Sequence, residues 1–528
     1  MVSLRVFRPV FLATGLACVA SSAAAAAAAD TLVDALVKAY QSNPVLQSQR
    51  YDLKALDEAY VRAYATVRPH GDLEVTADFV DSRAGDATQA LRLAVDPLSE
   101  RRVKSNKDDI RLVIEQLLYS GGQAASAIDA ADYRVRSGRQ SLRGAEGDLL
   151  LQVITSYEAV CRDTEDIAVQ QDNLKALDRQ LQMTEARRVA GEVTRTDVEQ
   201  ARAQFEAAQA QVTLAQAQLQ SSRITYATLV GDNPGTLEAP AGLPLIPATL
   251  DQALDIAAGN NPELLQAQFD ERESRAQADQ ARSANNLVVS ARSSYGFSGQ
   301  VSPFDRRDQD GDFSVGLTIS KPLFSGGANG SDYREALDRN SGDRLRIEAA
   351  RRQVVQNVMS AWNQAVSARL NTDIQQRQLA AAEVASEGMQ EEFRYGQRST
   401  LDVLVAEQNL TEARLALNAS QTEAYVAQAT LLRAMGYLEV RVLIVGVDPY
   451  NVSDNLRRLR ARHGVPWEKL VVAADGAGRS RARQPRLEAP DQGRLQPVLA
   501  PAQGQSQQLE LGTQSPTAPA PGTTAAVQ

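Results

Sequence analysis

The sequence predicts a mainly α-helical protein with a few membrane-length β-strands, built as a tandem structural repeat. Three observations predict this class: an internal duplication, long proline-poor helices with a heptad pattern, and four short runs that alternate apolar and polar residues. Helical periodicity and strand alternation are different patterns, so the two kinds of segment can be separated along the chain.

The duplication shows that one folding unit occurs twice. The segment 31–44 returns at 249–262, a shift of 218 residues, and the segment 118–122 returns at 323–327, a shift of 205. The second shift holds as far as Gly231, which returns as Gly436. Because a repeated register of this length indicates a repeated structure, we expect one repeat over 30–248 and another over 249–440.

Residues 1–29 predict a secretory signal peptide. Arg5 and Arg8 form a short basic start, an apolar run follows as far as Val19, and the polyalanine stretch after it offers several Ala-x-Ala cleavage sites. The apolar run is too short to span a bilayer. Lipid attachment at Cys18 is the alternative, although the residues before this cysteine match a lipoprotein signal poorly.

Composition excludes several classes of protein. The formal net charge of −9 argues against nucleic acid as a partner. The chain has only two histidines, which disfavours a histidine-based metal site, and no nucleophile–base pattern is convincing. We therefore expect no enzyme, cofactor or metal site. After the signal, no apolar stretch of about 20 residues remains, so no transmembrane helix is expected.

Two segments of each repeat predict long helices. Residues 123–190 contain no proline, and a continuous helix of this length would extend on the order of 100 Å. The following segments carry a heptad seam with one large and one small position, as in a close-packed coiled coil. The large positions are Phe205, Val212, Leu219, Tyr226, Leu410, Leu417, Ala424 and Leu431, and the small positions are Ala201, Ala208, Ala215, Ser222, Ala406, Ala413, Ser420 and Ala427.

Four runs, at 72–80, 110–115, 289–298 and 313–320, alternate as strands do. Their lengths approach the nine to eleven or so residues that a tilted strand needs to cross a bilayer. The expected apolar face consists of Leu73, Val75, Ala77, Phe79, Ile110, Leu112, Ile114, Val289, Ala291, Tyr295, Phe297, Phe313, Val315, Leu317 and Ile319.

Four strands cannot close a barrel, because roughly eight is the minimum. Open strand edges are not tolerated in lipid. The strands therefore form either soluble hairpins or part of a sheet that several chains complete, and about three chains would supply twelve strands.

Glycines predict the turns between these elements. Gly121 and Gly122 follow one strand, and Gly326 and Gly327 follow another, which predicts strand-to-helix turns. The Asn-Pro pairs at 43–44 and 261–262 predict helix breaks, because proline removes a hydrogen-bond donor and disfavours helix in the residue before it.

In this order of elements the chain resembles the TolC family of outer-membrane channel-tunnels. The resemblance covers 30–440, and its most specific pieces are the segments 188–201 and 395–404. It implies a homotrimer in which a periplasmic α-helical barrel is continuous with a 12-strand β-barrel in outer-membrane lipid, with four strands from each chain.

The resemblance also implies a periplasmic gate. Gly191 and Gly396 match the helix tips that close the tunnel, and Asp197 and Arg398 match a carboxylate and an arginine that hold the tips together. An aromatic hydroxyl that often assists this contact is replaced by Phe393.

Asp402 matches one of two aspartate rings just inside the entrance. The second position is Val405, so a trimer would present one carboxylate ring and a weaker preference for cations. The alternative for Asp402 is helix capping, since it follows Ser399-Thr400 at an expected helix start.

The C-terminal segment 441–480 is similar to a periplasmic segment of some type I secretion members of the family. Its arginine run at 457–462 is interpreted either as solvated or as a contact with the acidic channel body, the cell wall or a secretion partner. The Pro- and Gln-rich tail at 481–528 is expected to be disordered.

The resemblance implies an export duct across the periplasm and outer membrane. Because no nucleotide-binding motif is recognisable, energy would come from an inner-membrane ABC or other transporter, with a periplasmic adaptor (membrane fusion protein) between the two. The tail favours type I protein secretion. The alternatives are the duct of a multidrug efflux pump and, in another class, a structural periplasmic coiled-coil protein.

Overall fold

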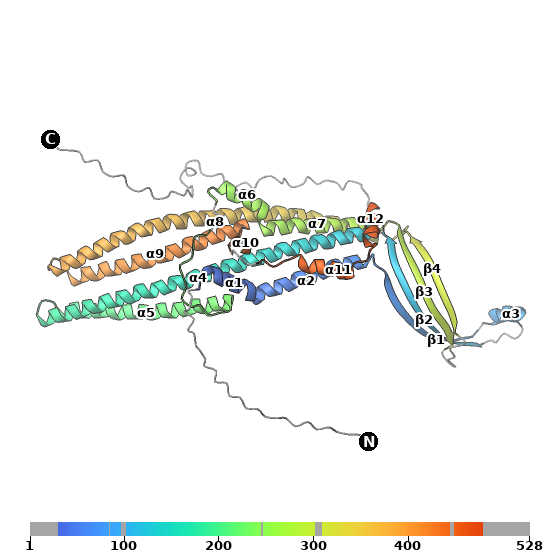
Figure 1. Cartoon of the computed structure of the whole chain (residues 1–528), viewed down its shortest axis with the longest axis horizontal. Helices are drawn as coiled ribbons and strands as arrows, with labels where there is room; N and C mark the ends of the chain where they lie inside the picture. Colours follow the sequence, from blue (N-terminus) through green and yellow to red (C-terminus); the bar gives the residue numbers. More distant parts are fainter. Residues whose placement is uncertain are drawn as a thin grey trace, which may run out of the picture.

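The computed structural model describes residues 30–83, 85–96, 102–243, 247–300, 309–443 and 448–478. A long bundle of helices continues at one end into a small β-sheet (Figure 1). The expected signal peptide with Cys18 and the expected disordered tail lie outside the described residues.

The two repeats have matching elements. The first contains α1 (Leu32–Ser42), α2 (Pro44–Ala65), β1 (His70–Arg83), α3 (Asp86–Val95), β2 (Arg102–Tyr119), α4 (Gln123–Val189) and α5 (Arg195–Val230). The second contains α6 (Leu250–Asn260), α7 (Pro262–Ser283), β3 (Val288–Gln300), β4 (Asp310–Ser320), α8 (Ala328–Arg394) and α9 (Thr400–Met435). Three short helices follow: α10 (Val440–Leu443), α11 (Asp454–His463) and α12 (Glu468–Ala477).

The matching helices agree in length, which confirms the expected duplication. α4 and α8 have 67 residues each, α5 and α9 have 36 each, and α2 and α7 have 22 each. The sequence did not predict α3, an exposed ten-residue helix between β1 and β2. No corresponding helix can be compared in the second repeat, because the connection at 301–308 lies outside the described residues.

The Asn-Pro pairs break the helices as expected, and they do so through the same contacts in both repeats. Asn43 caps α2 by accepting from two backbone amides, and its side-chain amide donates to the Leu229 carbonyl at 3.1 Å. Asn261 caps α7 and donates to the Ala434 carbonyl at 2.8 Å. These contacts place each break against the end of the heptad helix of the same repeat.

Gly436 ends the second heptad helix, and this position requires glycine. Its φ is +75°, and an added Cβ would lie 2.4 Å from the carbonyl oxygen of Asn260. A side chain would therefore separate α9 from the break between α6 and α7.

The heptad seams are present, and on α9 the small positions are buried better than the large ones. On α9, Ala413, Ser420 and Ala427 are buried, whereas Leu417 is half-buried. On α5, the large positions Val212, Leu219 and Tyr226 are buried and Phe205 is half-buried. Small residues allow α5 to approach α4 and α9 to approach α8.

The largest hydrophobic core lies midway along the bundle, where α1 and α6 pack across the long helices. Tyr157 of α4 and Trp362 of α8 lie in this core, which also includes buried residues from α5 and α9. None of the described helices has the length and apolar character needed to cross a membrane.

All four expected strands are present, and they form one antiparallel sheet in the order β1-β2-β3-β4. The two hairpins are not independent, because β2 pairs with β3 from Lys107 opposite Gln300 to Tyr119 opposite Val289. The strands are longer than expected, and β2 has 18 residues. Within the described residues, β1 and β4 are the two edges of the sheet.

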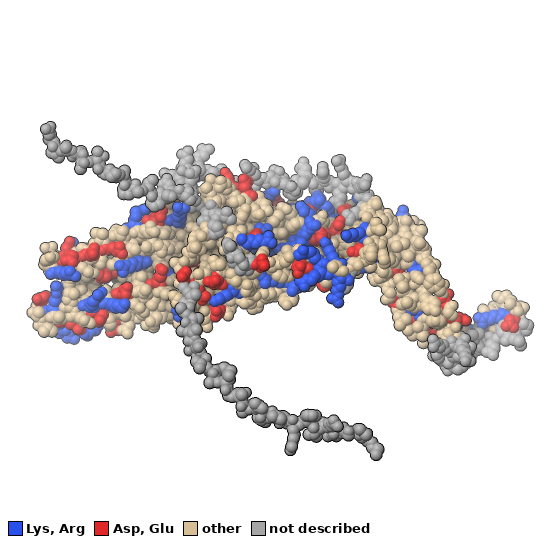
Figure 2. Space-filling view, viewed as in Figure 1, with Lys and Arg blue, Asp and Glu red and all other residues tan. Residues whose placement is uncertain are grey.

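The register places the expected apolar residues on one face. Leu73 lies opposite Leu112, Leu112 lies opposite Tyr295, and Tyr295 lies opposite Phe313. These side chains are substantially exposed in the single chain. On the visible face of Figure 2 few charges lie over the strands, whereas charges of both signs cover the helices. An exposed apolar face of this extent is suited to lipid.

Candidate functional site

The turn between α4 and α5 lies at the end of the bundle far from the sheet (Figure 1). Gly191 has a φ of +80°, a left-handed conformation that favours glycine. Its amide donates to the Arg188 carbonyl at 3.0 Å, and the amide of Glu192 donates to the Arg187 carbonyl at 3.0 Å. These bonds satisfy carbonyls that the end of α4 would otherwise leave open.

The turn between α8 and α9 repeats this geometry. Gly396 has a φ of +75° and donates to the Phe393 carbonyl at 3.0 Å, while Gln397 donates to the Glu392 carbonyl at 2.9 Å. The two tips thus have the same turn geometry, and differences between them arise from side chains.

Asp197 and Asp402 have equivalent positions in the first turns of α5 and α9. The Asp197 carboxylate accepts from the Thr194 amide at 2.8 Å, and the Asp402 carboxylate accepts from the Ser399 amide at 3.0 Å. Thr194 and Ser399 are the N-cap residues, so each aspartate is the third residue of its helix. Within one chain, the contacts of Asp402 are therefore those of a helix cap.

Arg398 exists in only one tip, because Val193 occupies the equivalent place in the other. Its Nε donates to Glu392 at 2.7 Å. The Ser399 amide and hydroxyl hold the pKa of Asp402 below its usual value, and the charge of Arg398 adds to this effect. Within the described part of one chain, no hydrogen bond or ion pair joins Asp197 to Arg398.

The structure adds a contact between the tips that the sequence did not predict. Phe393 is buried, and the guanidinium of Arg187 lies 4.4 Å from the centre of its ring. An arginine over an aromatic ring is attracted to the ring face. The sequence also did not predict that Glu392 binds Arg398, because a separation of six residues is not a spacing that brings side chains together on a helix.

Val405 lies one turn into α9 and is exposed.

The strand-to-helix junctions form the second candidate region. Gly121 and Gly122 have φ of +66° and +97°, and Gly326 and Gly327 have φ of +62° and +89°. These conformations let each chain turn sharply from a strand into a long helix. Gly122 and Gly327 also precede α4 and α8 and offer them no side-chain cap.

A carboxylate from the C-terminal segment caps the first junction. Asp475 of α12 is 1% exposed. Its Oδ1 accepts from the Ser120 amide at 2.5 Å, the Ser120 hydroxyl at 2.9 Å and the Gly122 amide at 3.1 Å. Its Oδ2 accepts from the Ala125 amide at 3.0 Å. The carboxylate thereby satisfies the free amides at the start of α4, where the helix dipole also favours negative charge.

The rest of the C-terminal segment also contacts the bundle. Arg460 of α11 lies with its guanidinium 4.5 Å from the Tyr60 ring centre and 3.9 Å from Asp132. Arg68, just before β1, pairs with Glu468 at 3.0 Å. These contacts of Arg460 agree with the interpretation in which the arginine run contacts the channel body. Arg457 and Arg458 instead pair within α11, with Asp454.

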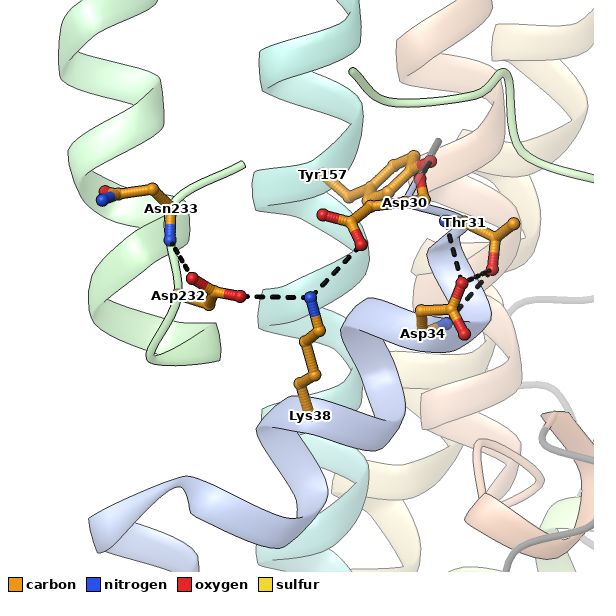
Figure 3. A network of polar contacts seen from close by, with 7 residues as sticks. All are labelled: Asp30, Thr31, Asp34, Lys38, Tyr157, Asp232 and Asn233. Atoms are coloured by element: carbon orange, nitrogen blue, oxygen red, sulfur yellow. Dashed lines mark hydrogen bonds and ion pairs between the residues drawn. The ribbon is translucent and has the colours of Figure 1, made fainter. Parts of the chain in front are cut away.

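The start of the described chain is tied to the connection between the repeats (Figure 3). The Lys38 ammonium donates to Asp30 and to Asp232, each at 3.2 Å, and it holds the pKa of Asp232 below its usual value. The Tyr157 hydroxyl lies 2.9 Å from the Asp30 carbonyl oxygen and 2.7 Å from that of Glu238. This network anchors α1 to α4 and to the end of α5.

A cavity of about 410 Å³ lies between α4, α5 and α9. Glu158 lines it and is 6% exposed, and burial, with a further contribution from Glu165, raises its pKa to about 7. Within the described residues, Glu158 Oε1 and Arg223 Nε lack hydrogen-bond partners. Burial and the charge of Glu158 also raise the pKa of the Cys161 thiol to about 12.

We expect Glu158 to make stability depend on pH. Its pKa is raised on folding from 4.5, so its contribution is fully present below about pH 4.5 and is lost as the pH rises through about 7. Each pKa unit corresponds to about 1.4 kcal/mol. Glu158→Gln should remove this dependence, measured as the unfolding midpoint of detergent-extracted protein at pH 5 and 8. Exposed Glu199→Gln is the control, and equal slopes in both variants would contradict the assignment.

Known proteins resemble this chain in sequence and in fold. A family profile described as outer membrane efflux protein matches residues 35–232 and 253–437. The chain is 27% identical over 431 residues to the outer membrane efflux protein BepC of Brucella suis, covering 82% of this chain and 91% of BepC. It is 26% identical over 311 residues to the alkaline protease secretion protein AprF of Pseudomonas aeruginosa, covering 57% and 64% of the two chains.

The fold comparison agrees with the sequence comparison. A crystal structure of a membrane protein from Pseudomonas aeruginosa superposes with a TM-score of 0.67 at 21% identity, over 78% of this chain and 92% of that chain. The Campylobacter jejuni CmeC outer membrane channel superposes with a TM-score of 0.68 at 14% identity, over 81% and 89%. At these identities the likeness concerns the fold.

Proposed function

Since this chain belongs to the outer membrane efflux protein family, we propose that three copies of it form a passive export duct across the periplasm and the outer membrane. Membership places the protein in the outer membrane, and its fold is that of transport channels. The observation that carries the proposal is the exposed apolar face of a four-stranded sheet, with β1 and β4 as its edges within the described residues, joined directly to helices of 67 residues.

Three chains would give twelve strands, enough for a closed barrel in lipid. The long helices would then continue the duct to the tips. The tips would form its periplasmic entrance, with Asp197 of one copy bound to Arg398 of another and with one ring of Asp402 carboxylates inside. A periplasmic adaptor would contact the duct, and an inner-membrane ABC or other transporter would supply the energy.

Within this function, the proposed system is type I protein secretion. The likeness to the secretion protein AprF and the folded segment formed by α11 and α12 support it. The duct of an efflux pump is the second candidate, and the greater coverage of the efflux protein BepC favours it. Deleting the gene separates the two: loss of a protein from the culture medium supports secretion, and drug sensitivity with an unchanged medium supports efflux.

Single-channel recording of detergent-extracted protein in a planar bilayer tests the duct itself. Small, long-lived, cation-preferring current steps are expected. Leu317→Arg should weaken insertion, because a charge on the lipid face of a membrane strand is destabilising by an amount that rises to roughly 2–4 kcal/mol at the bilayer midplane. Thr318→Arg, the adjacent exposed position on the opposite face of β4, is the matched control and should still conduct. Folded wild-type protein that never inserts would favour a structural coiled-coil protein instead.

A further inference from the structure

The cavity between α4, α5 and α9 contains two charged groups that the chain leaves unpaired. Glu158 of α4 and Arg223 of α5 both line it, and within the described residues neither side chain forms a hydrogen bond or an ion pair. Glu158 is 6% exposed. Buried polar groups in native proteins nearly always have partners, because burying an unpaired charge is costly. The two groups therefore indicate a ligand that binds between them.

Other polar groups that line this cavity have partners in the chain. The Arg162 guanidinium pairs with Asp163 at 2.6 Å. The Asn418 side-chain amide donates to the Arg162 carbonyl at 2.9 Å. The Tyr425 hydroxyl donates to the Ala241 carbonyl at 2.9 Å. The two unpaired groups differ from these neighbours, so they are not explained by a generally open or poorly packed wall.

A third charge lies on the same wall of the cavity. Glu165 lines the cavity and is exposed, so it lies on the solvent side. It follows Glu158 by seven residues, a spacing that places both side chains on one face of α4. Because Arg162 is already balanced by Asp163, the cavity offers a ligand two carboxyl groups and one guanidinium.

The internal duplication shows that the fold does not require these three charges. The helices of the second repeat have the same lengths as those of the first. At the shift of 205, the residues equivalent to the three charges are all uncharged: Asn363, Leu370 and Gln428. The charges therefore serve something that only the first repeat does.

We propose that this cavity binds a small molecule with two ammonium groups and one carboxylate, such as a basic amino acid. The ligand carboxylate binds Arg223, and its ammonium groups bind Glu158 and Glu165 through charge-assisted hydrogen bonds. The charges of ligand and cavity then balance. The volume of about 410 Å³ lies within the range of small-molecule sites. The inference goes beyond the export duct and does not depend on it, because every residue of the site belongs to one chain.

The site also joins separate parts of the fold. The segment 235–240, which connects the two repeats, lines the cavity together with α4, α5 and α9. A ligand that binds the folded chain and not the unfolded one stabilises the fold. We therefore expect the ligand to raise the thermal unfolding midpoint of the protein as well as to bind.

Titration calorimetry of the detergent-extracted full chain tests the proposal with four probes. L-lysine carries all three groups, cadaverine lacks the carboxylate, L-norleucine lacks the side-chain ammonium, and L-glutamate carries the opposite net charge. At pH 8 Glu158 is mainly ionised, because its pKa is about 7. L-lysine should bind once per chain. Cadaverine and L-norleucine should each bind about 10-fold more weakly or worse, since each loses a hydrogen bond to a charged group. L-glutamate should not bind.

Variants assign the contacts. Glu158→Gln keeps the size of the side chain and should weaken L-lysine binding about 10-fold or more. Arg223→Gln should remove the preference for L-lysine over cadaverine. Glu199→Gln, an exposed change on α5 outside the cavity, is the control and should bind as the wild type does.

No L-lysine binding by folded wild-type protein would overturn the proposal. Equal affinity in Glu158→Gln and Glu199→Gln would overturn it too, because the ligand would then bind elsewhere. If Arg223→Gln does not fold, the wild-type comparison of L-lysine with cadaverine tests the same contact, and equal affinities would exclude a role for the guanidinium. Single-channel current is measured in parallel, so failure of the site is distinguished from failure of the duct.

Discussion

Asp475→Ala is expected to detach α12 and to loosen the start of α4. The carboxylate accepts four hydrogen bonds in a buried site, and three of its donors are backbone amides of buried residues. Each hydrogen bond to a charged group contributes about 1.5–3 kcal/mol to stability. A loss of roughly 3 kcal/mol or more is therefore expected for the docking of this segment.

Limited proteolysis and hydrogen exchange measure this loss. Asp475→Ala should expose α11 and α12 to cleavage and speed amide exchange at Gly122 and Ala125. Asp454→Ala is the matched control, because it removes an aspartate of the same segment that makes only ion pairs at the surface. Equal protection in the two variants would show that Asp475 does not hold the segment.

Asp197→Ala combined with Arg398→Ala is expected to raise single-channel conductance several-fold. In the proposed trimer these side chains join neighbouring copies at the entrance, so their removal would let the tips separate. Arg398 is held by Glu392 within its own chain. This local pair would position the guanidinium for the neighbour. Unchanged conductance in the double variant would remove the gate assignment.

A capping control separates the two roles of Asp197. Its carboxylate also closes the first turn of α5, and loss of such a cap costs about 1 kcal/mol. Thr194→Ala removes the hydroxyl contacts of the same cap but keeps the charge of Asp197. If Thr194→Ala opens the channel as strongly as the double variant, helix fraying rather than charge is responsible. The expected result is a closed channel in Thr194→Ala and an open one in the double variant.

Local chemistry explains why so much of the fold could be predicted. The Asn-Pro breaks at Asn43 and Asn261 follow from the missing donor of proline, and the alternation of Leu73 to Phe79 follows from the geometry of a strand. The glycines at the tips indicated turns because few other residues adopt their backbone conformation. Helix α3 was not predicted, and within the described part of the chain none of its residues is buried.

The candidate site was predictable in its positions but not in its contacts. The sequence located Asp197, Arg398 and Asp402 at the two tips. It did not indicate that Glu392 holds Arg398 or that Arg187 covers Phe393, because both contacts depend on how the turns orient neighbouring side chains.

The sequence by itself determined the duplication, because the same segments recur along the chain at shifts of 205 and 218 residues. It also determined the long helices, the four strands and their apolar face, because these follow from periodicities only a few residues long. Only the tertiary structure decided that β2 pairs with β3, that the C-terminal segment folds back along α2 and α4, and that Asp475 caps the first junction but nothing described caps the second. Asp475 lies at least 350 residues from the amides it binds, and contacts at such separations leave no periodic trace in the chain.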